Sequence, residues 1–133
     1  MKTIRYLTLV ISVLPTMAFA CQCNEIDINN SYNESAMVVY ANVQDFIPAP
    51  SGEGGTAIII IKHWWKSSSP ERVAVNSLTN CNLDFEIGSS YLLFLGMESN
   101  GLYYADKCSG SKILTFNNEY SKTLKNIKNN TKK

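Results

Sequence analysis

The four cysteines constrain this chain more than any other feature of its 133 residues; they are Cys21, Cys23, Cys81 and Cys108. An even number of cysteines in an exported protein favours disulfides. Cys21 and Cys23 are separated by one residue, and in an extended segment their Cα atoms lie near the ~7 Å limit for an unstrained bridge. Both are therefore predicted to bond to Cys81 and Cys108, and the sequence leaves either pairing open.

Residues 1–20 have the pattern of a secretory leader. Two basic residues, Lys2 and Arg5, precede an apolar stretch that is shorter than the ~20 residues a membrane-spanning helix needs, and small residues occupy the cleavage site that ends at Ala20. We predict that residues 1–20 are a signal peptide and that the mature chain, secreted or periplasmic, begins at Cys21. An uncleaved anchor, or a lipoprotein signal that attaches lipid to Cys21, are the alternatives.

The remaining chain has the length of one domain. We predict a domain over residues 21–128 and a flexible tail over residues 129–133. Removal of Lys2 and Arg5 leaves 10 basic and 11 acidic residues. This balance predicts no nucleic-acid partner, and no transmembrane segment is expected after the leader is removed.

Catalytic and metal-binding motifs are sparse. His63 is the only histidine, so a Ser-His-Asp triad or a multi-histidine metal centre lacks partners. A zinc site of four thiolates is an alternative to the disulfides, but a C-x-C pair with two isolated cysteines lacks the usual ligand spacing. The sequence therefore predicts a protein that is not an enzyme and needs no cofactor.

Short runs rich in β-branched and aromatic residues predict an all-β fold. Asn100-Gly101 is a hairpin signal. The strands are expected at residues 36–46, 56–65, 72–77, 91–97 and 102–105, a spacing typical of a barrel or sandwich. Near the end of the chain, Tyr120, Leu124 and Ile127 fall at helical spacing among lysines and predict one amphipathic helix.

Trp64 and Trp65 are the only tryptophans and end one predicted strand. Because neighbouring residues in a strand point to opposite faces, one is expected in the core and the other on the surface. Stacking of a ligand on the surface ring is the alternative, and binding of an anionic partner by the basic last helix is another.

Taken in order, several motifs resemble a netrin-like module, and most closely the inhibitory domain of tissue inhibitors of metalloproteinases. They are the C-x-C at Cys21–Cys23, VVYANVQDF, KHWWKS, a cysteine ahead of F-x-x-G-x-x-Y-L-L-F (Phe85–Phe94), and GLYYADKC ending at Cys108. The resemblance implies a five-stranded OB-fold barrel with a C-terminal helix, and the bridges Cys21–Cys81 and Cys23–Cys108. With four cysteines and one domain, the chain is similar to the bacterial single-domain members.

A free Cys21 terminus has chemistry of its own. Its α-amine has an unperturbed pKa of about 7.7–8.0, so part of it is uncharged near neutral pH and can bind a metal. The amine nitrogen and the carbonyl oxygen of the same residue can then form a five-membered chelate ring. A catalytic zinc with three protein ligands keeps an open position for such a chelate. The resemblance implies that the chain inhibits a zinc metalloproteinase in this way.

The predicted partner-binding ridge surrounds this terminus. Alternation along an extended segment directs Gln22 outward when the flanking cysteines point inward. The predicted contact residues are Cys21, Gln22, Cys23, Asn24, Thr79, Asn80 and Asn82. A non-inhibitory protein- or ligand-binding module on the same scaffold is the alternative function, because a scaffold does not establish an activity.

Overall fold

The computed structural model describes residues 21–68, 70–114 and 118–130. The predicted signal peptide and residues 131–133 of the predicted tail therefore lie outside the described residues. The elements, in chain order, are α1 (Ile28–Glu34), β1 (Met37–Pro48), β2 (Gly55–Lys66), β3 (Arg72–Ser77), β4 (Ser90–Met97), β5 (Tyr103–Tyr104), the 3-10 helix η1 (Lys107–Ser109), β6 (Lys112–Ile113) and α2 (Asn118–Asn130).

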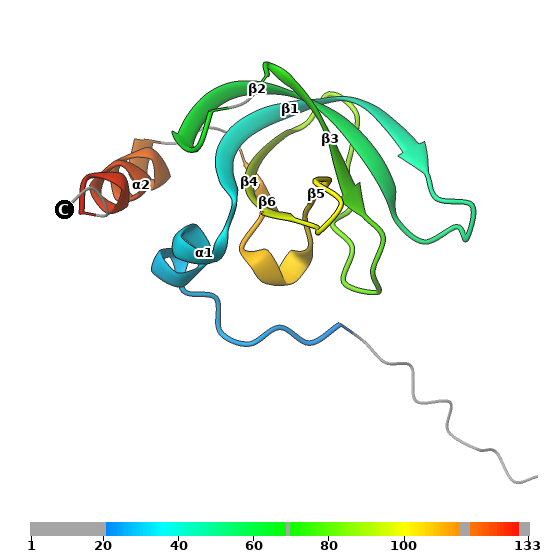
Figure 1. The fold of residues 1–133 in the computed structure, drawn as a ribbon, viewed down its shortest axis with the longest axis horizontal. Coiled ribbons are helices and arrows are strands. Elements are labelled where there is room, and N and C mark those ends of the chain that lie inside the picture. The colour runs from blue at the N-terminus through cyan, green and yellow to red at the C-terminus, as the bar shows by residue number, and fades with distance from the viewer. Residues whose placement is uncertain (1–20, 69, 115–117, 131–133) are drawn as a thin grey trace, which may run out of the picture.

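Five strands close into a barrel (Figure 1). Their order is β1-β2-β3-β5-β4, and β4 pairs with β1 to complete the ring. All these pairs are antiparallel except the parallel pair β3–β5. The short strand β6 adds to the edge of β4 that also carries β5. The prediction of an all-β, five-stranded OB-fold-like barrel with a C-terminal helix is confirmed.

The inside of the barrel is a continuous apolar core. Alternate residues of β1 and β2 point inward, as the period of two in a strand requires. The buried members from these two strands are Met37, Val39, Ala41, Val43, Ala57, Ile59 and Ile61. Residues from β3 and β4, together with Leu83, Phe85 and Ala105 from the loops, fill the rest.

A second apolar cluster lies on the outer face of the barrel, beneath the two helices. Tyr32 from α1, together with Leu124 and Ile127 from α2, packs here on outward-facing residues of β1, β2 and β4. Tyr32 Oη also donates a hydrogen bond to the carbonyl of Trp65 at 2.9 Å. The helices therefore cover one side of the barrel, and the predicted amphipathic helix is confirmed.

The tryptophans point to opposite faces, as predicted, but neither is a free surface ring. Trp65 is 5% exposed in the outer cluster, whereas Trp64 is half-buried and packs against the barrel core. Opposite β1, the pairing register of β2 skips Lys62, and this β-bulge moves the next inward-facing position from His63 to Trp64. A second skip, at Trp65, follows. The expectation that one tryptophan lies on the surface is therefore wrong.

The predicted strands all form, and their ends differ from the predicted ones by at most two residues. The structure adds α1, η1 and β6, which the sequence reasoning did not predict. Helix α2 continues to Asn130, two residues into the predicted tail. The Asn100-Gly101 hairpin connects β4 to β5, with Gly101 in the left-handed region at φ 83°.

The side chain of Ser77 links the end of β3 to two neighbouring segments through hydrogen bonds. Its hydroxyl donates to the carbonyl of Ala105 and accepts from the amide of Leu83, both at 2.7 Å, and the residue is 2% exposed. Ser77→Ala leaves two buried backbone groups without a partner, so we expect the free energy of unfolding to fall by about 2 kcal/mol. Denaturant titration measures this. Ser51→Ala, at an exposed loop hydroxyl, is the matched control and is expected to cost less than about 0.5 kcal/mol; equal losses would contradict the assignment.

Candidate functional site

Two disulfides fasten the N-terminal segment to the barrel. Cys21 is joined to Cys81 and Cys23 to Cys108, with Cα atoms 5.1 Å and 5.0 Å apart. This is the pairing that the resemblance implies. The segment from Cys21 to Asp27 has no regular secondary structure. Its position therefore depends on the two bridges and on the helix that follows.

The two attachment points are neighbours in the fold. The amide of Lys107 donates to the carbonyl of Cys81 at 2.9 Å, and Asn82 forms an isolated antiparallel bridge with Asp106. As a result, the disulfides lie side by side, and the sulfurs of Cys21 and Cys108 are 3.7 Å apart. Both cysteines of the C-x-C pair are held against one rigid region next to the barrel.

The predicted ridge residues flank these attachment points. Gln22 is exposed between the two bridged cysteines. Thr79 and Asn80 are exposed in the turn before Cys81, where the amide of Asn82 donates to the Thr79 carbonyl at 3.0 Å. Asn24, also exposed, follows the second bridge, and Asn82 is half-buried. The structure thus gathers the predicted residues around the Cys21–Cys81 bridge; their contact with a partner stays a prediction.

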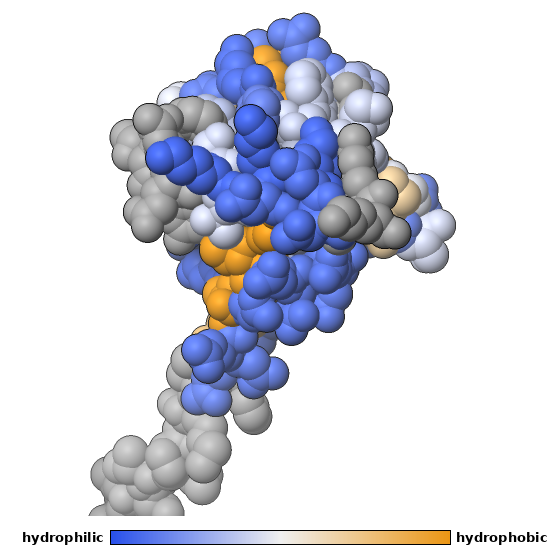
Figure 2. Space-filling view, turned by 90° about the vertical axis from the view of Figure 1, so that its left-hand side faces the viewer, coloured by the Kyte–Doolittle hydropathy of each residue, from blue (hydrophilic) through white to orange (hydrophobic). Residues whose placement is uncertain are grey.

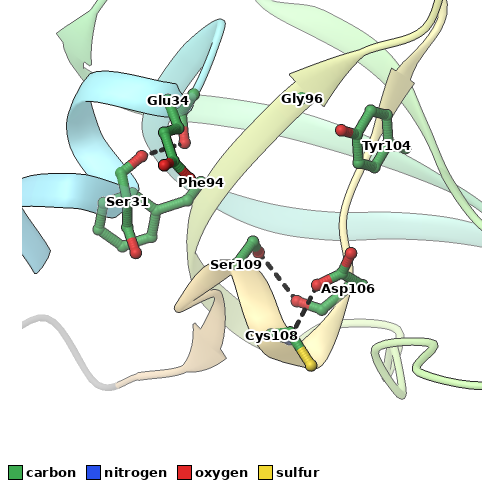
Figure 3. Close-up of a pocket in the computed structure, with 9 residues that line it drawn as sticks. Ser31, Glu34, Phe94, Gly96, Tyr104, Asp106, Cys108 and Ser109 are labelled. Carbon is green, nitrogen blue, oxygen red and sulfur yellow. Dashed lines mark hydrogen bonds between the residues drawn. The ribbon is translucent and has the colours of Figure 1, made fainter. Parts of the chain in front are cut away.

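A groove next to the N-terminal segment consists of two adjoining pockets, which share the lining residues Ser31, Glu34 and Cys108. The pocket beside Gln22, of about 370 Å³, lies between the N-terminal segment and α1. The other pocket, of about 240 Å³, lies between α1, β4, β5 and η1. Figure 3 shows Glu34 of α1 on one side of it and Tyr104 and Asp106 on the other.

Carboxylates give this groove its negative character. Asp27 caps α1 by accepting from the amide of Asn29 at 2.9 Å, and Asp106 caps η1 by accepting from the amide of Cys108 at 2.8 Å. These two therefore have structural roles. Glu34 is exposed at the end of α1 and lines both pockets.

Lys66 stabilises the end of α1 that carries Glu34. Its ammonium donates to the carbonyls of Tyr32 and Asn33 at 2.7 and 2.9 Å, which places a cation at the helix C-terminus. Partial burial lowers the pKa of Lys66 from its usual value. The lysine thus fixes the helix wall of the groove.

Sequence reasoning missed this groove. Its wall depends on α1, whose signal was present: Asp27 is a good N-cap, and Ile28 and Tyr32 stand four residues apart on one helix face. No comparable signal predicted that Tyr104 and Asp106, about seventy residues later, would lie across from this helix.

Apolar residues also gather near the N-terminal segment. Figure 2 shows a narrow hydrophobic strip, between hydrophilic areas, that leads down to this segment on the side carrying α1 and α2. Ile26, Ile28 and Phe94 line a neighbouring pocket of about 360 Å³, whose wall also includes Lys107 and Lys112. The terminus is therefore bordered by polar and apolar surfaces.

Comparison with known proteins does not assign a family. No protein-family model matches the chain, and no curated protein matches it significantly. The two disulfides indicate an oxidising compartment. Within the described ranges, none of the helices has the length and apolar character needed to cross a bilayer.

Proposed function

We propose that the mature chain is a secreted or periplasmic netrin-like module that inhibits a zinc metalloproteinase through Cys21. The observation that carries the proposal is the pair of adjacent disulfides, which hold Cys21 and Cys23 beside each other and leave Gln22 exposed between them. The proposed role is inhibition and not catalysis.

The mechanism follows from the position of the first residue. After cleavage at Ala20, the α-amine and carbonyl oxygen of Cys21 are the two atoms offered to the protease zinc, where they replace its bound water. Near neutral pH a substantial fraction of the amine is unprotonated. The two bridges order the terminus before binding, so little conformational entropy is lost when the complex forms. Gln22 is then placed to enter the specificity pocket next to the zinc.

The decisive test adds one alanine before Cys21 while cleavage is retained, with the start residue verified by intact mass. The extra residue moves the amine away from the chelating carbonyl. We expect inhibition of a panel of zinc metalloproteinases to weaken about 100-fold, equivalent to about 2.8 kcal/mol. An alanine added after Lys133 is the matched control and is expected to leave inhibition unchanged. Undiminished inhibition by the N-terminally extended protein would rule out the chelate.

The groove favours a second candidate function, a non-inhibitory module that binds a ligand carrying positive charge. Glu34 and Tyr104 would contact such a ligand from opposite walls of the pocket. Binding of this kind should survive the alanine extension and weaken in Glu34→Gln. The two functions therefore respond oppositely to the same pair of variants.

A further inference from the structure

We propose that the four cysteine sulfurs form a redox-gated metal site: the reduced protein binds one thiophilic divalent cation of the zinc type through four thiolates. The two disulfides and the bound cation are alternative states of the same four residues. This inference concerns the reduced protein, whereas the proposed inhibitor is the oxidised one.

The sulfur positions carry the proposal. Sγ atoms of Cys21, Cys23 and Cys108 all lie within 4.8 Å of one another. The sulfur of Cys21 is 4.0 Å from that of Cys23 and 3.7 Å from that of Cys108. In a tetrahedral site with Zn–S distances of about 2.3 Å, neighbouring sulfurs are about 3.8 Å apart. Two edges of the required tetrahedron are therefore already near their final length, and the fourth sulfur, of Cys81, is bonded to Cys21.

The movement that metal binding still requires is expected in the N-terminal segment, which carries Cys21 and Cys23. After reduction, the two sulfurs of each former disulfide must move apart to about 3.8 Å, the sulfur–sulfur distance of a tetrahedral zinc site. Cys81 and Cys108 are held together by the hydrogen bond from the Lys107 amide to the Cys81 carbonyl, and Asp106 caps the turn that carries Cys108. Cys21 and Cys23 lie in a segment without regular secondary structure. We therefore expect the N-terminal segment to move while the other two ligands stay in place.

The chemistry balances with an external reductant, a divalent cation and, for the return step, an oxidant. Reduction of two disulfides takes up four electrons and four protons and gives four thiols; two equivalents of a dithiol or phosphine reductant supply the electrons. Binding of the cation then releases the four thiol protons, because thiolates are the ligands. Reoxidation of the four thiolates to two disulfides gives up four electrons, for example to one O₂, which takes up four protons and becomes two waters; all four ligands are withdrawn and the cation is released.

The test uses the full chain, reduced with a phosphine under anaerobic conditions, and Co²⁺ as a spectroscopic probe. We expect one Co²⁺ per chain, with thiolate charge-transfer absorption and the visible bands of a tetrahedral site, and displacement of Co²⁺ by Zn²⁺. The oxidised protein should bind none. Native mass spectrometry should show one zinc per reduced chain, and circular dichroism should retain the β-sheet signal.

Ligand variants make the result specific. Cys81→Ser and Cys108→Ser should each weaken Co²⁺ binding by more than the roughly 10- to 100-fold caused by loss of an outer-shell partner. Ser109→Ala, next to Cys108, is the control and should bind normally. The proposal is overturned if the reduced chain takes up no stoichiometric Co²⁺, if either cysteine variant gives the parental spectrum, or if the ion is bound by an unfolded chain. None of these outcomes alters the inhibition expected of the oxidised protein.

Discussion

Replacing Cys23 and Cys108 together with serine is expected to lower the free energy of unfolding by about 3.6 kcal/mol. The bridge joins residues that are 85 apart, but the Cys21–Cys81 bridge shortens the loop that it closes to about 30 residues. Removing a cross-link that closes such a loop mainly raises the entropy of the unfolded chain. Cys23 is exposed and Cys108 half-buried, so the serine hydroxyls add little cost of their own. Equilibrium denaturation without reductant measures the change.

The matched variant removes the other bridge by replacing Cys21 and Cys81 with serine. With the Cys23–Cys108 bridge kept, this bridge closes a loop of the same length, about 30 residues, so the same loss of about 3.6 kcal/mol is expected. Because the two loops are equally long, a difference between the two variants reports local strain and not loop length. A loss below about 1 kcal/mol in either variant would show that the unfolded chain is already compact or that the native bridge is strained. Similar losses would support the chain-entropy account.

Local sequence signals predicted the strands well because each strand has its own pattern. The run from Thr56 to Trp65 is almost continuously apolar, and Arg72–Ser77 alternates around Val73 and Val75. Both are strands in the structure, the second with the predicted ends. The period of two in the buried residues is a local property, and it can be detected without knowing which strands pair.

Features that depend on distant contacts were not detected from local patterns. The pairing of β1 with β4 closes the barrel across about fifty residues, and it followed only from the resemblance to a known fold. The β-bulge at Lys62 shifted Trp64 inward, which strand alternation alone could not indicate. The groove beside Gln22 likewise depends on where α1 meets η1. The chemistry of the terminus was accessible because a C-x-C after a leader is a local motif.

Gly54→Ala is expected to lower the free energy of unfolding by about 3 kcal/mol. Gly54 lies before β2 with φ 67°, a conformation that costs about 1–2 kcal/mol for a residue with a side chain. An added Cβ would also overlap the backbone carbonyl of Ser77 at the end of β3. A backbone carbonyl cannot relieve the overlap by changing rotamer, as a side chain can. The clash therefore adds about 1–3 kcal/mol to the loss of unfolding free energy. Thermal or denaturant unfolding measures the sum.

Gly52→Ala is the control that isolates the clash. Gly52 has φ 81° in the same hairpin, but an added Cβ meets no atom within 4 Å, so only the conformational cost of about 1 kcal/mol is expected. Gly54 packs closely on the backbone of Ser77, whose hydroxyl bonds to Leu83 and Ala105. The free-energy losses of Gly54→Ala and Ser77→Ala should therefore not be additive. Equal losses in the two glycine variants would mean that the hairpin moves away from the end of β3 at no cost, and would contradict the predicted clash with Ser77.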